Sequence, residues 1–164
     1  MTYTFKATNN EEALPKAMRG KLMNILELTP DHGEQAALWY GKLLTAFGQP
    51  AYTTNDFEDI YTYIIEATAE DGERRVFSVY EGPTGPAIGG TEREQQAALA
   101  MIEYVKGVAP TDYEQEGYYF DGPTKIHRGV SGGEVFFSEV AVEWDAAKQA
   151  QNELSAMFRQ LQDE

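Results

Sequence analysis

The sequence has 164 residues, of which 42% are hydrophobic and 12% aromatic, with a formal net charge of −14 and no cysteine. This hydrophobic content predicts one folded globular domain, residues 1–164, and excludes a disordered acidic tail. The absence of cysteine excludes disulfides, cysteine-ligated metals and thiol nucleophiles, and suits the reducing cytoplasm that we expect as its location. No apolar run approaches the ~18 residues of a membrane-spanning helix, and the N-terminus does not resemble a signal peptide.

The negative charge is confined to one part of the chain. Residues 1–55 hold five acidic and five basic side chains, whereas residues 56–164 hold 22 acidic and 8 basic ones. A field of this sign repels nucleic-acid phosphates and accelerates the association of basic partners at low salt. Because net charge alone specifies no partner, the alternative interpretation is that it serves only solubility.

The first fifty residues predict a short strand and two helices. Residues 2–7 alternate polar and apolar side chains, as an edge strand does. Apolar residues recur at helical spacing over residues 11–28 and again over residues 34–47. The short turn between these helices predicts an antiparallel helical hairpin at the N-terminus. Trp39 lies off the main apolar stripe of the second helix, and we favour a packing role for it over an exposed anchor.

The next segment predicts a β-hairpin. Residues 60–65 and 76–80 are rich in β-branched and aromatic side chains, and Asp71-Gly72 between them is typical of a tight turn. A two-residue loop would place Glu66 on the same face as the apolar Ile64, Phe77 and Val79. A bulged three-residue loop brings the apolar side chains together on one face, so we expect that register; these are Ile65, Ala67, Phe77 and Val79.

A glycine-rich stretch and a capped helix follow the hairpin. Residues 82–90 contain two prolines, which lack an N–H donor, so we expect a connector that does not continue the sheet. Thr91 and Glu94 have the spacing of a capping box, and apolar residues then recur at helical spacing until Gly107.

The last third predicts an acid- and tyrosine-rich segment at residues 112–121, strands at residues 125–128 and 134–142, and a long C-terminal helix at residues 145–162. Because helices and strands do not alternate regularly, the fold class that we expect is α+β. It would be a single domain with a mainly antiparallel sheet and about four helices, chiefly on one face, including the N-terminal helical hairpin and the C-terminal helix.

No motif in the sequence predicts a catalytic, cofactor or metal site. The stretch 82–90 lacks the lysine of a P-loop and the dinucleotide fingerprint, so it is a poor phosphate site. The histidines, His32 and His127, do not lie in a recognisable triad pattern, and no calcium-loop spacing occurs. Acidic residues are so abundant that no carboxylate pair is specific. We therefore expect no cofactor.

Two segments that combine acids with tyrosines, 56–63 and 112–121, remain as candidates for a protein-binding surface. Tyrosine supplies rigid amphipathic area and carboxylates steer lysine and arginine. The alternative is that the tyrosines pack beside the sheet while the acids are merely solvated. The predicted partner-binding residues are Asp56, Glu58, Asp59, Tyr61, Tyr63, Asp112, Tyr113, Glu114, Glu116 and Tyr118.

The leading functional hypothesis is a non-enzymatic acidic protein that captures a basic protein partner and contacts neither nucleic acid nor membrane. An immunity or inhibitor protein for a nuclease-type toxin, or a DNA mimic, would bind through the same electrostatic attraction between an acidic surface and a basic partner. The alternatives are a small carboxylate-dependent hydrolase and a regulatory subunit without a ligand of its own.

Overall fold

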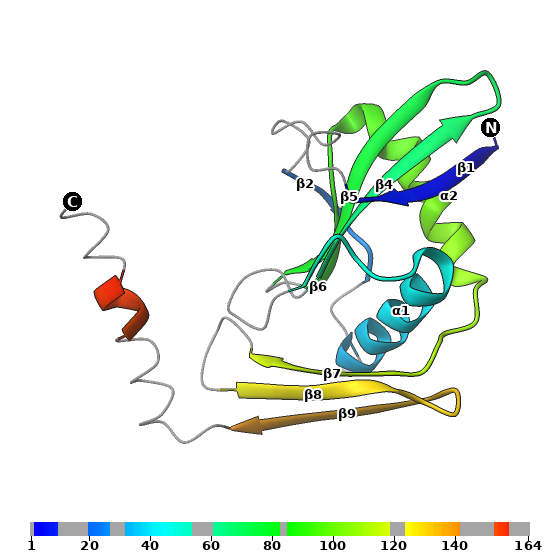
Figure 1. The fold of residues 1–164 in the computed structure, drawn as a ribbon. Helices are drawn as coiled ribbons and strands as arrows, with labels where there is room; N and C mark the ends of the chain where they lie inside the picture. Colours follow the sequence, from blue (N-terminus) through cyan, green and yellow to red (C-terminus); the bar gives the residue numbers. More distant parts are fainter. Residues whose placement is uncertain are drawn as a thin grey trace.

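The computed structural model describes residues 2–9, 20–26, 32–53, 61–82, 85–118, 124–141 and 153–157. In this part of the chain two antiparallel sheets and two long helices account for most residues (Figure 1). The elements are β1 (Tyr3–Thr8), β2 (Lys21–Asn24), α1 (His32–Phe47), β3 (Tyr52–Thr53), β4 (Tyr61–Ala69), β5 (Arg74–Gly82), β6 (Gly85–Gly89), the 3-10 turn η3 (Glu92–Glu94), α2 (Gln95–Lys106), β7 (Tyr113–Tyr118), β8 (Thr124–Ser131) and β9 (Glu134–Ala141).

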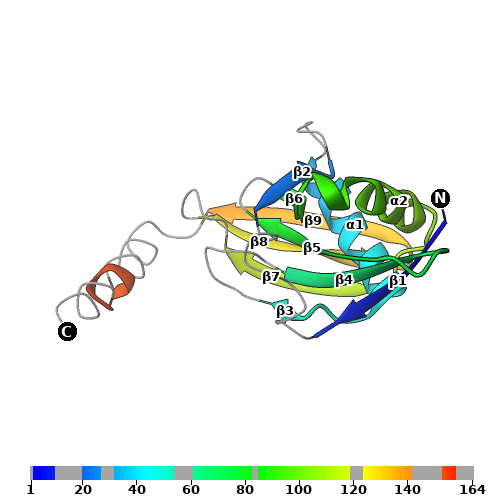
Figure 2. The same cartoon turned by 90° about the horizontal axis from the view of Figure 1, so that it is seen from above.

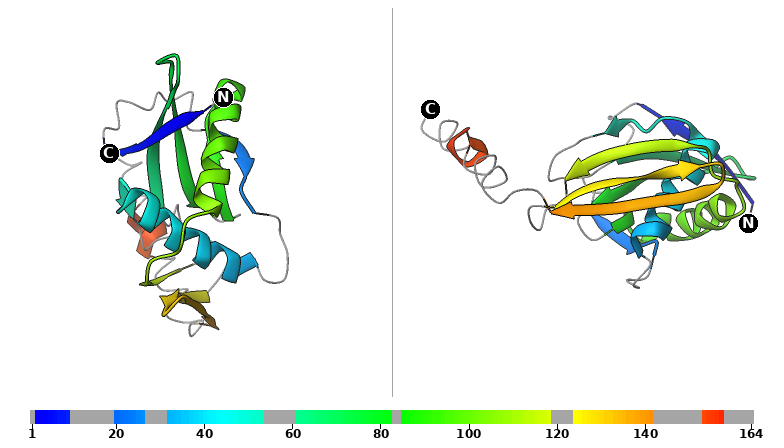
Figure 3. Two further views of the ribbon diagram at one scale, coloured as in Figure 1. Left: turned by 90° about the vertical axis from the view of Figure 1, so that its right-hand side faces the viewer. Right: turned by 90° about the horizontal axis from the view of Figure 1, so that it is seen from below.

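The two sheets lie on opposite sides of α1. The large sheet has the strand order β1-β4-β5-β6-β2, with β3 pairing β4, and the small sheet has the order β7-β8-β9. In Figures 1 and 3, α1 lies between them, and α2 lies against the large sheet beside α1. The view from above in Figure 2 shows the large sheet stacked over the small one. Helix α1 therefore has one sheet on each side.

The predicted hairpin and its register are confirmed. Ile65 pairs with Phe77 and Tyr63 with Val79, so the apolar side chains share one face. The amide of Ala69 donates to the carbonyl of Glu73 at 2.8 Å, which leaves a three-residue loop whose Gly72 has a φ of +86°. Glycine adopts this positive φ at low cost. This face of the hairpin supplies nearly all the buried residues that the large sheet contributes to the core against the helices.

Other local predictions are also confirmed. Strand β1 lies at one end of the large sheet, and β8 and β9 form the later hairpin. Thr91 and Glu94 form both bonds of the capping box at the start of the helical segment that continues as α2. Trp39 is 4% exposed, so it packs in the core.

The predicted N-terminal helical hairpin is wrong. Lys21–Asn24, within the predicted first helix, is strand β2, which pairs antiparallel with β6. The helical spacing of apolar residues over 11–28 is also compatible with a four-residue strand, and pairing with β6 satisfies its backbone. The rest of the predicted helix, apart from residues 20–26, lies outside the described residues.

The glycine-rich stretch does continue the large sheet, contrary to the prediction. Gly85–Gly89 is strand β6, paired with β5 on one side and with β2 on the other. Pro86 lacks a donor, but its carbonyl accepts a hydrogen bond from the amide of Ile25 at 3.0 Å. Ala87 and Ile88 are fully buried. Pro86 can therefore lie in a strand, because pairing with the chain at Ile25 uses only its carbonyl oxygen, which proline retains.

The fold class needs correction in its helices. The sheets are mainly antiparallel as predicted, but the expected four helices with an N-terminal helical hairpin are wrong. Of the predicted C-terminal helix, residues 153–157 are described; they are helical and exposed, and the rest of the segment lies outside the described residues. Leu154 and Met157 are 37% and 64% exposed, so the two described residues of the predicted apolar stripe are not buried. Residues 113–118, for which no strand was predicted, form β7.

Truncating two apolar residues of α2 should have unequal effects on stability. Met101 is fully buried and Leu99 is 48% exposed on the same helix. We expect Met101→Ala to lower the free energy of unfolding by about 2–5 kcal/mol, because it leaves a cavity. Leu99→Ala, the matched control, should change it by less than about 0.5 kcal/mol. Urea unfolding followed by circular dichroism measures both, and equal effects would contradict the packing of α2.

Candidate functional site

A buried ion pair joins the two sheets. Arg128 of β8 is 0% exposed; its Nη2 donates to Oε1 of Glu81, on β5, at 2.8 Å and lies 2.8 Å from Oε2 of the same carboxylate. Its Nε donates to the side-chain oxygen of Gln115, on β7, at 3.0 Å. Glu81 is 2% exposed. Because a buried charge is tolerated only when paired and hydrogen-bonded, this contact fixes the small sheet against β5.

Tyrosines surround the ion pair. The rings of Tyr40 and Tyr61 stack with centroids 4.4 Å apart, and Tyr113 meets Tyr40 edge-on at 4.9 Å. The Tyr113 hydroxyl donates to the carbonyl of Ala37, in α1, at 2.5 Å, and the Tyr63 hydroxyl donates to the carbonyl of Gly48, just after α1, at 2.7 Å. These bonds tie β7 and β4 to the helix between them.

The protein environment raises the pKa values of the tyrosines and the arginine in this cluster. Burial raises the pKa of Tyr61 well above its ordinary 10.0, and it raises the pKa values of Tyr40, Tyr63 and Tyr113 as well. Burial alone would lower the pKa of Arg128, but the charge and hydrogen bond of Glu81 outweigh it and raise that pKa. The tyrosines therefore stay neutral and Arg128 stays charged at physiological pH.

An open hollow of about 420 Å³ lies beside this cluster, at the edge of β7. One wall comes from α1 and the residues after it, including a residue of β3, and the other wall comes from β7. Its size falls within the ~300–1,000 Å³ of ligand pockets. The lining residues are Tyr40, Leu44, Gln49, Thr53, Tyr113, Glu114, Gln115 and Glu116, among which none is basic.

Strand β7 presents opposite chemistry on its two faces. Tyr113 and Gln115 are half-buried and point toward α1 and Arg128, whereas Glu114 and Glu116 are exposed. The side chain of Glu114 is 70% exposed and lies 2.6 Å from Nε2 of His127. Strand alternation therefore places the carboxylates on the outer face of the small sheet.

The predicted partner-binding residues are divided by the fold. Tyr61 and Tyr63 are fully buried, so their rings contribute to the core and offer no surface to a partner. Asp112, Glu114 and Glu116 are exposed and close together in the chain, and Tyr113 lies half-buried among them. Asp56, Glu58 and Asp59 lie outside the described residues, as does the side chain of Tyr118. Sequence reasoning missed Tyr40, Glu81, Gln115 and Arg128.

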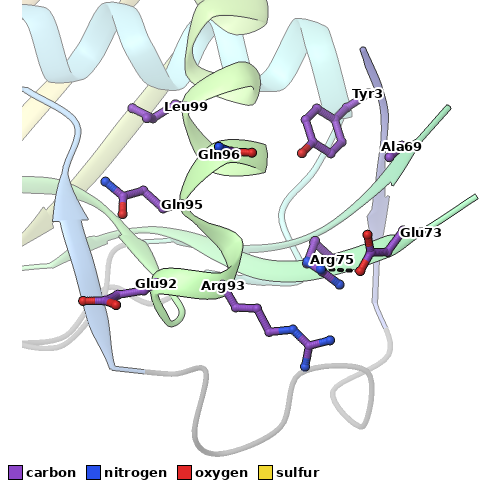
Figure 4. A pocket seen from close by; sticks show the side chains of 9 residues that line it. All are labelled: Tyr3, Ala69, Glu73, Arg75, Glu92, Arg93, Gln95, Gln96 and Leu99. Carbon is purple, nitrogen blue, oxygen red and sulfur yellow. Dashed lines mark hydrogen bonds and ion pairs between the residues drawn. The ribbon is translucent and has the colours of Figure 1, made fainter. Parts of the chain in front are cut away.

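A second hollow, of about 540 Å³, lies between β1, the β4–β5 hairpin and the start of α2. Figure 4 shows Arg75 joined to Glu73 on the hairpin, across from Arg93 and Gln95. Its two arginines are balanced by Glu73 and by Glu92. Since the charges cancel, this hollow selects neither sign of ligand, and the hollow at β7 is the stronger candidate.

Among the described residues, no group of three or more histidine, aspartate or glutamate side chains could hold a metal ion. No described helix is both long and apolar enough to cross a membrane. The chain matches no protein-family model, and no curated protein or solved structure matches it. The fold and site thus define an α+β chain with two antiparallel sheets joined by a buried ion pair and an acidic hollow at the edge of the smaller one.

Removing one partner of the ion pair should be more harmful than removing both. We expect Arg128→Met to lower the free energy of unfolding by about 3–5 kcal/mol, because it leaves the Glu81 carboxylate buried without its cation. Arg128→Met combined with Glu81→Leu should recover much of that loss. Chemical denaturation of the single and double variants gives the coupling energy, and purely additive losses would contradict a direct interaction.

The raised tyrosine pKa values predict a loss of stability at alkaline pH. A tyrosine whose pKa is higher in the folded than in the unfolded chain stabilises the fold fully below the unfolded value, about 10. As pH rises above that value, the unfolded chain loses its phenolic protons first and stability falls. Tyrosinate absorbance should therefore increase together with unfolding measured by circular dichroism; ionisation of every tyrosine while the fold persists would contradict this expectation.

Proposed function

We propose that this chain is a non-catalytic binding protein that captures a basic protein partner. The observation that carries the proposal is the outer face of the small sheet, where Glu114 and Glu116 are exposed at alternate positions of β7 and Asp112 is exposed just before it. Arg128, on the neighbouring strand, points inward and is neutralised by Glu81. Arg128 therefore does not cancel the negative charge of Glu114 and Glu116 on the outer face.

The charge of the whole chain supports the same proposal. A net charge of −14 attracts basic proteins at long range and repels nucleic acid. A basic protein that itself binds nucleic acid, such as a nuclease-type toxin, is a suitable partner, because carboxylates can occupy the positions where it binds phosphates. In this form the chain acts as an immunity or inhibitor protein, or as a DNA mimic. The mechanism is occupation of a cationic cleft, with no covalent step.

The test is affinity capture with the whole chain as bait, followed by a salt gradient and mass spectrometry. Glu114→Lys combined with Glu116→Lys should abolish capture of a basic partner, because the outer face of β7 would then be positively charged and would repel it. The matched control is Glu70→Lys combined with Glu103→Lys, which changes net charge equally at exposed positions of the β4–β5 turn and of α2.

The partner should bind wild type and control alike and should be released as salt screens the charges. Equal loss of capture in both variants would mean that binding depends on overall charge alone and not on the outer face of β7. Capture of no basic protein by the wild type would overturn the proposed function.

A further inference from the structure

We infer that Phe136, on the outer face of the small sheet, is a docking point for an arginine side chain of the basic partner. This inference rests on the proposed function, and it names the chemistry by which the outer face would recognise one kind of side chain. Three features of this face support it: an aromatic ring that no described element covers, a carboxylate beside that ring, and the acidic character of the other described side chains.

Phe136 points away from the core, in contrast to the next residue of β9. The ring of Phe137 packs against the core and lies against Gly33, near the start of α1. Because side chains alternate along a strand, Phe136 lies on the opposite face, where it is half-buried. The view from below in Figure 3 shows this face of β7, β8 and β9 with no described helix or strand in front of it. A partner can therefore reach the ring directly.

A glycine on the middle strand lets the Phe136 ring extend toward Glu114. Phe136, Gly129 and Glu114 lie directly opposite one another on β9, β8 and β7. A Cβ atom at Gly129 would lie 2.5 Å from Cζ of Phe136, so the tip of the ring occupies the space above this glycine. Since Cζ is the ring atom farthest from the backbone, the ring points across β8 toward β7. The aromatic surface and the Glu114 carboxylate are thus neighbours on one face.

His127 joins the aromatic ring and the carboxylate into one cluster. Its ring centroid lies 5.4 Å from that of Phe136, and its Nε2 atom lies 2.6 Å from Oε1 of Glu114. The Glu114 side chain is nevertheless 70% exposed. A carboxylate has about four lone-pair positions on its two oxygens, so Glu114 can accept hydrogen bonds from a guanidinium group while the contact with His127 persists.

The surroundings of this cluster favour a cationic ligand. Alternation along β7 and β9 places further exposed carboxylates on the same face; these are Asp112, Glu116 and Glu134. Among the described side chains of this face, His127 is the one that can carry positive charge, since Arg128 points inward to Glu81. A second copy of this chain would bring like charges against the face, whereas a basic partner brings opposite charges.

Arginine fits this combination better than lysine does. Its planar guanidinium group stacks on aromatic rings and presents N–H groups to a carboxylate in a fork, whereas the lysine ammonium is a compact point charge. Neighbouring strands lie about 4.8 Å apart, so a guanidinium group above Gly129 is within reach of Phe136 on one side and of Glu114 on the other. The two contacts can therefore form together on one arginine.

The experiment titrates the capped peptide Gly-Arg-Gly-Arg-Gly into the isotopically labelled chain and follows aromatic and amide signals by NMR. One matched peptide carries lysine, which keeps the charge without the planar group. The other carries citrulline, which keeps a planar group without the charge. We expect saturable shifts at the Phe136 ring and at the Gly129 and Glu114 amides with the arginine peptide, weaker binding of the lysine peptide, and no binding of the citrulline peptide. Absence of Phe136 shifts with the arginine peptide would overturn the inference, as would equal binding of the lysine peptide.

One variant removes the aromatic ring and keeps an apolar side chain. Phe136→Leu should weaken binding of the arginine peptide roughly twofold to fivefold, which is the size of an exposed cation–aromatic contact. The matched control is Tyr104→Leu, because Tyr104 is 50% exposed on α2, against the large sheet, and binding should be unchanged. An aromatic ring over a strand glycine also stabilises a sheet. A Phe136→Leu variant that is less stable but binds the peptide as the wild type does would therefore show a structural role alone and overturn the inference.

Capture experiments on the same variants separate this inference from the proposed function. If Phe136→Leu captures a basic protein as well as the wild type and releases it at the same salt concentration, the docking point is wrong and the acidic surface stands. If the arginine peptide shifts Phe136 but the wild type captures no basic protein, the arginine site stands and the proposed function fails. Release at lower salt from Phe136→Leu than from Tyr104→Leu, together with weaker peptide binding, supports the docking point.

Discussion

The contact between Arg128 and Glu81 determines where the small sheet lies. Burying both ions costs several kcal/mol each, which their attraction and the bond from Arg128 to Gln115 offset. An apolar contact alone would let the two sheets shift relative to each other, whereas these hydrogen bonds fix the direction and distance between the bonded groups. Glu81 lies at the end of β5 and Gln115 in the middle of β7, so the one guanidinium sets the position of β7 relative to the large sheet. The hollow at the β7 edge depends on that position.

Alternation along β7 lets one strand serve both stability and surface chemistry. Its inward residues, Tyr113 and Gln115, bond to α1 and to Arg128. Its outward residues, Glu114 and Glu116, remain exposed on the same rigid backbone. Carboxylates on a strand fixed in this way lose little freedom when a partner binds, unlike carboxylates on a free loop. The acid–tyrosine composition of this segment therefore has two physical roles, divided by strand geometry and not by residue type.

Local patterns predicted much of the large sheet, while the site depended on contacts between distant segments. The register around Ile65 and Phe77 followed from placing apolar side chains on one face, and the capping box at Thr91 is a local signal. Strand β2 was missed because pairing with β6 outweighs a helical spacing. Arg128 was missed because nothing local marks it as buried. Glu81 carried a signal, since it continues the inward alternation of Phe77 and Val79.

In the proposed capture, net charge and direct contacts with β7 would govern different quantities. The charge of −14 acts over long distances, so it raises the association rate for any basic protein, and this effect falls with added salt. Contacts with the exposed carboxylates of Glu114 and Glu116 would act only at short range and would slow dissociation, which is where related complexes differ most in affinity. A partner is then selected by the placement of its basic side chains against this rigid strand, which overall charge cannot distinguish.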